Sequence, residues 1–451
     1  MFKKILLFSA FLWMLFSIES NAQWQPLFNG KDLNGWKQLN GNAKFEAKNG
    51  EIVGTTVIGE PNSFLATEKT YKDFRMKFQV MLEAPINSGV QFRSESKASY
   101  QNGRVHGYQF EIDPTARAWS GGIYDEARRE WLYPVDLNEP ARKVIPLNQW
   151  IDCEIACKGN EIRTYINGNP VAYLVDDMTP EGFIALQVHD IGNDTKNEGK
   201  KIRWRNLQIN VKPFQWEDAG DQLIVNLIPN TLTEQEKRSG YKLLFDGKTT
   251  AGWRGAYKNA FPEKGWQIGN GEITVLPSGG GESTHGGDIV TTDKYGSFIF
   301  LFEFKMTQGA NSGVKYFVTE TEGNTGSAIG LEYQILDDKV HPDANQGSIG
   351  NRKLASLYDL IPAIENPRAR RPVGEWNRGI IIVKPDGLVE HYLNGYKLLH
   401  YERGSQYYKA LVAKSKYANW PEFGMAPEGR ILLQDHGDKV SFRNIKIREL
   451  K

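Results

Sequence analysis

Residues 74–82 read FRMKFQVML, a stretch in which apolar and polar side chains alternate. Successive side chains of a β-strand point to opposite faces, so this alternation predicts a strand with one buried face. The pattern recurs in IDCEIAC (151–157), EIRTYI (161–166) and IRWRNLQINV (202–211). Turn sequences such as KNGE, KGNE and INGN separate the runs. Many short strands with glycine-rich turns predict an all-β chain built from sandwiches of two antiparallel sheets.

The chain also repeats itself over a long distance. LFNGKDLNGW (27–36) matches LFDGKTTAGW (244–253), and NSGVQF (87–92) matches NSGVKY (311–316). PEGFIALQVH and PEGRILLQDH follow later in the same order. The copies differ by loop insertions, as duplicated domains do. We therefore expect two tandem sandwich domains, at residues 23–212 and 240–451.

Residues 213–239 form the expected linker between the two copies. Its sequence NTLTEQEKRSG offers Thr231 as the N-cap of a helix, with Glu234 three residues later and Gly240 as the stop. This spacing is typical of a capping box. We expect a linker with one short helix.

The N-terminus resembles a secretory signal. Lys3 and Lys4 precede an apolar run, and the small residues Ser20 and Ala22 suit signal peptidase. We expect residues 1–22 to be removed and the mature protein to be periplasmic or extracellular, free of the membrane. The alternative is a retained N-terminal anchor, although the apolar run is short for a spanning helix.

Charge and cysteine content exclude several classes of partner. Lys plus Arg number 55 against 54 Asp plus Glu in 451 residues. This balance gives no field to attract nucleic acid or an anionic membrane, so we expect a small-molecule or oligosaccharide substrate. Cys153 and Cys157 fall on one face of a strand about 13 Å apart, beyond the reach of a disulfide. We expect both to pack in the core.

Two strands place polar groups where a sandwich strand should be apolar. GYQFEIDP (107–114) puts Gln109, Glu111 and Asp113 on one face. GLEYQILDD (330–338) puts Glu332 and Gln334 on one face and ends in two aspartates. Such a face is either solvated or a site. On a curved sheet, carboxylates about 5–9 Å apart could act as an acid/base pair on a sugar.

Further candidates surround these strands. His189 and His436 each lie two residues after a matching Gln, Gln187 and Gln434. HGGD (285–288) occurs only in the second copy and predicts a turn or a ligand-facing loop. Three spaced His ligands for zinc are missing from the sequence, which argues against a zinc site.

These motifs resemble the 3-keto-disaccharide hydrolase domain family, over nearly all of residues 24–212 and 240–450. The resemblance implies a concanavalin A-like jelly-roll sandwich. It also implies a disaccharide or glycoside substrate whose glucose ring carries a ketone at C3. The first copy departs from the pattern, because it lacks HGGD and has Val188 where the second has Asp435. Activity of both copies is therefore an open question.

A C3 ketone acidifies the C2 proton, so a base could form an enolate and the C1 oxygen could leave by elimination, followed by addition of water. We expect Glu111, Glu332, His189 and His436 to carry acid/base roles. The residues expected to bind the substrate are Arg93, His106, Gln109, Asp113, Trp119, Tyr124, Asp125, Gln334, Tyr358 and Asp359. A divalent cation could replace the arginine at the enolate, with Asp337, Asp338 or Asp435 as ligands.

Two other functions remain open from the sequence. An ordinary retaining or inverting glycosidase would use the same fold, but Glu111-Ile-Asp113 runs into Pro114 without a second Glu. A tandem sugar-binding module would need aromatic platforms and few buried acids, whereas both copies contain the acids. Fold alone does not separate these three functions.

Overall fold

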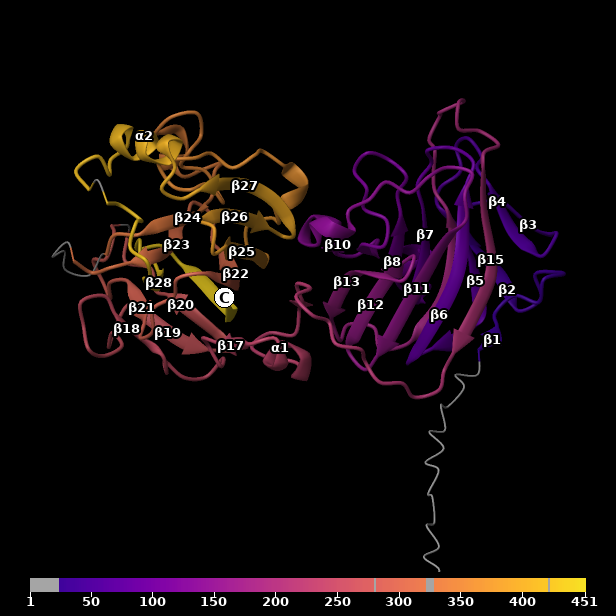
Figure 1. Cartoon of the computed structure of the whole chain (residues 1–451), viewed down its shortest axis with the longest axis horizontal. Helices are drawn as coiled ribbons and strands as arrows, with labels where there is room; N and C mark the ends of the chain where they lie inside the picture. The colour runs from indigo at the N-terminus through magenta and orange to yellow at the C-terminus, as the bar shows by residue number, and fades with distance from the viewer. Residues whose placement is uncertain (1–23, 280, 322–327, 421) are drawn as a thin grey trace, which may run out of the picture.

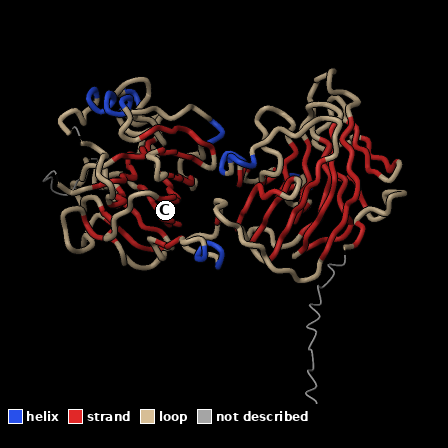
Figure 2. Tube along the Cα trace, in the orientation of Figure 1, coloured by secondary structure: helices blue, strands red, loops and turns tan. Residues whose placement is uncertain are grey.

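The structure is a computed structural model that describes residues 24–279, 281–321, 328–420 and 422–451. Two β-rich bodies lie side by side (Figure 1), and strands dominate both of them (Figure 2). Among the described residues, no helix is both long and apolar enough to cross a membrane. The expected signal at residues 1–22 lies outside the described residues.

The first domain packs two sheets against each other, with nine and seven strands among the described residues. The larger sheet runs β16 (Val225–Asn226), β13 (Asn169–Val175), β12 (Glu161–Ile166), β11 (Ile151–Lys158), β6 (Phe74–Leu82), β15 (Lys201–Asn210), β4 (Glu51–Thr55) and β3 (Lys44–Lys48), with β1 (Gln25–Pro26) beside β15. The smaller sheet runs β10 (Glu130–Tyr133), β9 (Ile123–Glu126), β8 (His106–Ile112), β7 (Ser88–Glu95), β14 (Gly182–Val188), β5 (Ser63–Tyr71) and β2 (Trp36–Asn40).

The second domain repeats this plan with eight and five strands among the described residues. Its larger sheet runs β19 (Trp266–Gly269), β20 (Glu272–Val275), β29 (Val440–Glu449), β22 (Phe298–Met306), β25 (Asn377–Val383), β26 (Leu388–Leu393) and β27 (Tyr396–Glu402), with β17 (Tyr241–Leu243) beside β29. The smaller sheet runs β18 (Trp253–Gly255), β21 (Ile289–Thr291), β28 (Arg430–Leu433), β23 (Asn311–Val318) and β24 (Leu331–Leu336). Helix α2 (Gln406–Lys414) follows β27.

The alternating stretches form the strands that the sequence predicted. In β6 the apolar side chains other than Met81 are buried, and the polar ones are half-buried or exposed. Cys153 and Cys157 are free thiols within the first domain's core, as expected. Trp36 and Trp253, from the repeated opening phrase, each lie buried in the core of their own copy. The all-β class with two tandem jelly-roll sandwiches is confirmed.

The linker fastens the two domains together. β16 adds a parallel edge strand to β13 of the first domain. Helix α1 (Glu234–Arg238) begins two residues later than the sequence suggested, because Thr233 is its N-cap and Glu236 completes the capping box. The carboxylate of Glu236 also lies 2.9 Å from the ammonium of Lys446 in β29, and both side chains are 1% exposed. Thr233 and Glu236 have the same local spacing as Thr231 and Glu234, and the ion pair with Lys446 favours the later of the two boxes.

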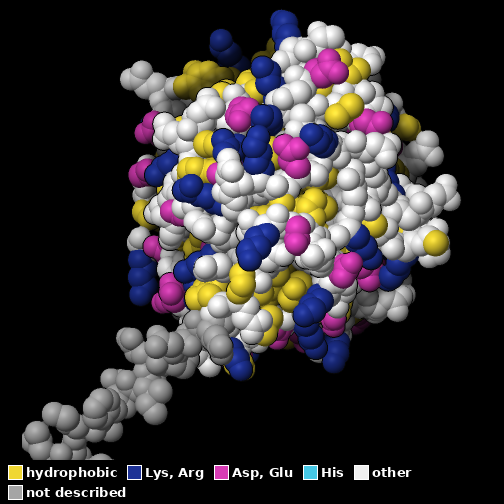
Figure 3. All heavy atoms as spheres, turned by 90° about the vertical axis from the view of Figure 1, so that its right-hand side faces the viewer, with side chains coloured by type: hydrophobic (Ala, Val, Ile, Leu, Met, Phe, Trp, Pro, Cys, Tyr) yellow, Lys and Arg dark blue, Asp and Glu magenta, His cyan; other side chains and the backbone are white. Residues whose placement is uncertain are grey.

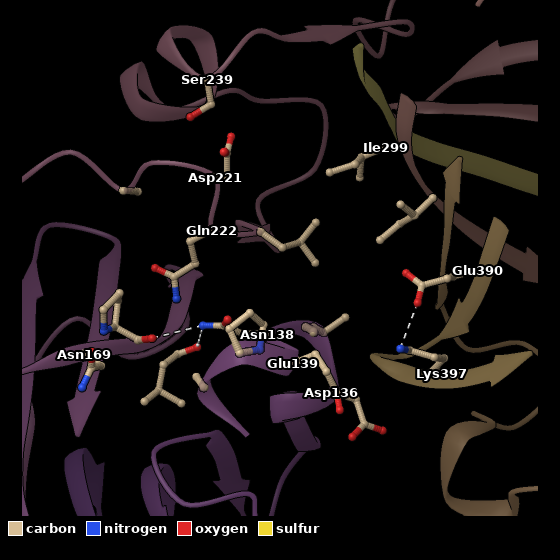
Figure 4. Close-up of a pocket in the computed structure, with 18 of the residues that line it drawn as sticks. Asp136, Asn138, Glu139, Asn169, Asp221, Gln222, Ser239, Ile299, Glu390 and Lys397 are labelled. Carbon is tan, nitrogen blue, oxygen red and sulfur yellow. Dashed lines mark hydrogen bonds and ion pairs between the residues drawn. The ribbon is translucent and has the colours of Figure 1, made fainter. Parts of the chain in front are cut away.

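The β9–β10 end of the first domain packs on the second domain. The Trp119 ring lies 5.4 Å from that of Tyr396, and the Arg378 guanidinium donates to the Leu132 carbonyl at 3.1 Å. Beside this contact lies a cleft of about 1600 Å³ lined by both domains and the linker. Figure 4 shows its wall, where Lys397 pairs with Glu390 at 2.9 Å. The surface of the first domain carries both signs of charge interspersed (Figure 3).

Candidate functional site

The sheet register decides which side chains of the two copies are equivalent. Opposed pairs on the polar face of the smaller sheet are Gly89–Glu111 and Gln91–Gln109 in the first copy, and Gly313–Gln334 and Lys315–Glu332 in the second. Glu332 therefore occupies the place of Gln109, and Glu111 that of Gln334. The two predicted catalytic glutamates lie one row apart, about 6.6 Å along the strand, and are not equivalent.

The second copy gathers a charged cluster on this polar face. The Lys315 ammonium lies 3.3 Å from a Glu282 oxygen and 3.7 Å from an Asp288 oxygen. Glu332 stands opposite Lys315 in the neighbouring strand. Asp288, Lys315 and Glu332 are 0%, 5% and 4% exposed, respectively. One buried cation thus faces three carboxylates, two of which are buried.

Burial and mutual charge shift the proton affinities of this cluster. Burial raises the pKa of Asp288 to about 7, against the lowering effect of Lys315. Burial also raises the pKa of Glu332, while Lys315 and Lys416 lower it. Burial alone would lower the pKa of Lys315, but Asp288 and Glu332 raise it above its ordinary value. Lys315 therefore remains cationic at neutral pH beside carboxyls with enhanced basicity.

The HGGD loop is held over this cluster by Asp435. The Asp435 carboxylate accepts hydrogen bonds from the backbone N–H of Gly286 at 3.1 Å, Gly287 at 2.9 Å and Gly437 at 3.0 Å. The Asp435 N–H in turn donates to the Asp288 carboxylate at 2.9 Å. Val188, at the same place in the first copy, could accept none of these bonds. Asp435 thus positions Asp288.

The matching place to Asp288 in the first copy is apolar. Leu65 lies opposite Leu186 in the first copy, and Ile289 lies opposite Leu433 in the second. Phe64, one residue before Leu65, is therefore equivalent to Asp288, one residue before Ile289. Phe64 packs in a small cluster with Ala66, Val105, Phe183 and Ala185. The first copy therefore has Phe64, Gln91 and Gln109 where the second has Asp288, Lys315 and Glu332.

Tyr358 and Asp359 lie beside the second copy's cluster in a network of their own. The Tyr358 hydroxyl donates to Asp343 at 2.8 Å, and Arg352 bridges Asp343 at 2.9 Å and Asp359 at 2.7 Å. The Lys416 ammonium lies 4.2 Å from the Tyr358 ring centroid. Burial raises the pKa of Tyr358, and Glu332 raises it further. This network fixes an aromatic ring and a cation at the edge of the polar face.

His436 is half-buried at the other edge of the same face. Its Nε2 lies 3.3 Å from the Asn311 side-chain nitrogen, and its ring lies 6.2 Å from that of His341. Gln334 donates to the Asn311 side-chain oxygen at 3.4 Å. The predicted residues Glu332, Gln334, Tyr358 and His436 therefore come together around the cluster in the second copy.

In the first copy, Glu111 is held by neutral and cationic donors. Its carboxylate accepts from Asn87 at 2.6 Å, Gln109 at 3.0 Å and Arg117 at 3.1 Å. Arg117 also pairs with Asp113 at 2.6 Å. Burial raises the pKa of Glu111, against these hydrogen bonds and the Arg117 charge. Glu111 and Asp113 thus both pair with Arg117.

The other candidates of the first copy point to separate partners. Arg93 donates to the Lys72 and Gly159 carbonyls and to Asp73, all in turns at the end of the sandwich. His106 lies 3.6 Å from Glu95 and stacks on Tyr100. Trp119 donates a hydrogen bond to Asp136. Asp125 pairs with Arg128 and Arg129, and His189 contacts the Asp190 carbonyl. Tyr124 keeps the place of its counterpart Tyr358, because it lies opposite Gln109 and the Tyr358 N–H donates to the Glu332 carbonyl.

The carboxylates predicted as metal ligands are engaged elsewhere. Asp337 accepts the N–H groups of Gly309 and Lys339, and Asp338 accepts that of Leu354 and pairs with Arg370. Over the part of the chain that the structure describes, no group of three or more His, Cys, Asp or Glu side chains is placed to hold a metal ion. The assignment of Asp337, Asp338 and Asp435 as metal ligands therefore stays a prediction.

Lys315 is the residue that sequence reasoning missed. It stands in NSGVKY, where the first copy has NSGVQF, and the single Lys for Gln change was available from the repeat. The signal for this site in the sequence was a lysine within a predicted strand, and the structure shows that this strand is buried throughout its length. Its meaning depended on Asp288 and Glu332, which come from two other strand regions.

Comparison with known proteins agrees with the two copies. The model of the 3-keto-α-glucoside-1,2-lyase-like domain matches residues 23–210 and 240–448. A curated relative, the 3-keto-disaccharide hydrolase of Bacteroides thetaiotaomicron, is 39% identical over 232 residues, which are 47% of this chain and 79% of the relative.

Solved structures are also similar to parts of the chain. A protein from Parabacteroides distasonis, described as a candidate glycosyl hydrolase, is 35% identical with a TM-score of 0.43, over 49% of this chain and 100% of that one. Carbohydrate-binding module CBM66 from Bacillus subtilis is 14% identical with a TM-score of 0.30, over 39% and 95%. On the two family matches, the chain belongs to the 3-keto-α-glucoside-1,2-lyase-like domain family and carries that domain twice.

Proposed function

We propose that this protein is a carbohydrate-active hydrolase that cleaves the glycosidic bond of 3-keto-disaccharides or 3-keto-glycosides, and that its second copy performs the reaction. The family and its curated relative support a hydrolase acting on sugars. The observation that carries the assignment is the contrast between the two polar faces. The second has the ionisable set Asp288, Lys315 and Glu332, whereas the first has neutral side chains at the same register positions.

The proposed reaction begins with proton transfer. Glu332, made more basic by burial, takes the C2 proton, and the electron pair passes to the C3 oxygen as an enolate. Lys315, a buried cation that can only donate hydrogen bonds, stabilises the negative charge on that oxygen. Burial strengthens this interaction because water does not screen it.

Elimination and hydration complete the reaction. The enolate collapses to a ketone, a C1–C2 double bond forms, and the C1–oxygen bond breaks. His436 donates the proton that the leaving oxygen needs. Water then adds at C1 and gives a proton to His436, while C2 regains its proton from Glu332, so both residues return to their starting states and the net change is hydrolysis. Tyr358 and Lys416 orient the sugar at the edge of the face, with Tyr358 held by Asp343.

Sugar release from paired substrates tests this function. The purified protein, with and without a chelator, is incubated with a disaccharide and with its 3-keto form, and the released monosaccharide is measured. We expect cleavage of the keto form alone. Equal cleavage of both forms would indicate an ordinary glycosidase, and binding of sugar without turnover would indicate a binding module.

A matched pair of variants tests the choice of copy. Lys315→Met should lower kcat/KM by about 100- to 1000-fold, the range for loss of one oxyanion donor. Gln91→Met changes the equivalent residue of the first copy and should leave turnover unchanged. Equal losses in the two variants would show that both copies are active and would contradict the assignment.

A further inference from the structure

A carboxylate oxygen of Glu282 lies between two buried donors of the second copy. It is 3.3 Å from the Lys315 ammonium and 3.3 Å from the side-chain nitrogen of Gln434. The Lys315 side chain is 7% exposed and Gln434 is 4% exposed, whereas the Glu282 side chain is 42% exposed. An oxygen from the solvent side therefore rests on a buried pair of N–H groups, which is the geometry of an oxyanion hole.

Of the three carboxylates around Lys315, Glu282 is the most exposed. Asp288 is fully buried, and the Asp435 N–H fixes its position. Glu282 belongs to a loop whose backbone is tethered on both sides of it, at Ser278 and Ser283. Its side chain is 42% exposed and can turn into water, where a carboxylate is well solvated, whereas Lys315 stays buried.

The first copy shows the same glutamine without such an oxygen. Gln187 matches Gln434 in sequence and in register. Gln187 lies opposite Gly89 in the first copy. In the second copy, Gln434 follows Leu433, which lies opposite Val314. Gln187 is 0% exposed, and within the described part of the chain neither its side-chain nitrogen nor its side-chain oxygen has a hydrogen-bond partner. This glutamine position thus presents an amide to the polar face in both copies, and in the second copy its N–H is paired by Glu282.

We propose that Lys315 and Gln434 together bind the C3 oxygen of the substrate, and that Glu282 occupies this position in the resting protein until substrate displaces it. The proposal rests on the proposed function and names the second donor and the gating residue of that site. The Lys315 ammonium offers only donors, which suits a ketone oxygen and its enolate because both only accept. A C3 hydroxyl would bring a donor of its own toward the ammonium, so the pair favours the oxidised sugar.

Removing Glu282 separates binding from chemistry. Glu282→Ala should lower KM for the 3-keto-disaccharide by at least about two- to fivefold, with kcat unchanged, because that range holds for a fully exposed ion pair and Lys315 is buried. The vacated pair should also bind a small carboxylate. We therefore expect millimolar acetate to inhibit Glu282→Ala competitively and to raise its melting temperature, with neither effect in the unmodified protein.

Gln434 has a matched control in the other copy. Gln434→Met should lower kcat by about 100- to 1000-fold. Gln187→Met should leave kcat and KM unchanged. If Gln434→Met lowers the melting temperature, acetate binding by Glu282→Ala alone decides the case.

Two results would overturn the proposal. One is an unaltered KM in Glu282→Ala together with no response to acetate. The other is wild-type turnover by folded Gln434→Met. If no form of the protein cleaves a 3-keto-sugar, the proposed function fails, whereas an acetate-induced stabilisation confined to Glu282→Ala would still support the donor pair.

Discussion

Asp288→Asn should make the stability of the second domain less dependent on pH. Asp288 is 0% exposed, and one of its oxygens has no hydrogen-bond partner among the residues that the structure describes. Burial raises the pKa of this carboxyl from 3.8 to about 7. A raised folded-state pKa contributes stability that is fully present below pH 3.8 and is lost as the pH rises through 7. The asparagine has no proton to lose, so this contribution disappears.

The size of the effect follows from the pKa of Asp288. Each pKa unit corresponds to about 1.4 kcal/mol, so the ionised carboxylate costs about 4 kcal/mol of folding free energy above pH 7. Between pH 5 and pH 8 the native protein should lose about 3 kcal/mol through this group. For a domain of about 200 residues this corresponds to roughly 10 °C in melting temperature.

Thermal unfolding at pH 5 and pH 8 measures this difference in the protein and in Asp288→Asn. Glu320→Gln is the control with the opposite sign. Burial would raise the pKa of Glu320, but hydrogen bonds from Arg254 and the Tyr257 N–H hold it at about 2. Glu320 is therefore ionised throughout this pH range, and its loss should destabilise equally at both values. An Asp288→Asn protein with the same fall between pH 5 and pH 8 as the native protein would refute the reasoning.

Three further predictions concern the linker, the HGGD loop and the N-terminus. Glu236→Ala leaves Lys446 buried without its counter-charge and should lower the free energy of unfolding by about 3–5 kcal/mol, measured by denaturant titration. An unchanged midpoint would show that the linker does not hold the domains. Asp435→Val introduces the residue of the first copy and removes three backbone hydrogen bonds. Asp435→Val should therefore melt earlier and cleave the keto-sugar more slowly, whereas wild-type turnover would show that loop order is not needed. Intact-mass measurement of exported protein should show a chain that begins after Ala22, and a retained residue 1–22 segment would contradict the signal.

The sandwiches could be predicted because strand burial is a local property. The stretch Phe74–Leu82 buries one face, as its alternation indicates, and the repeated opening phrase revealed the second domain. The helix start was displaced by two residues. Glu236 caps that helix while pairing with Lys446, which lies 210 positions further along the chain, and no local pattern contains that contact.

The candidate site could be predicted only in part. The polar faces of GYQFEID and GLEYQIL were visible as alternation, and the structure gives both of them a place on the smaller sheets. Glu111 and Glu332 looked equivalent because each strand contains one glutamate. Only the pairing with β7 and β23 shows that they lie in different rows, since register depends on the neighbouring strand and not on the strand itself.

By itself, the sequence determined the duplication, the all-β class, the core-facing side of alternating strands such as β6 and the glutamine common to both copies. The tertiary structure decided which charges share one environment. Glu282 lies in a loop and Asp288 directly precedes strand β21, whereas Lys315 and Glu332 lie in strands β23 and β24. These side chains interact through space. Their proton affinities depend on separation and burial, and these quantities exist only once the sheets have paired and the HGGD loop has closed over them.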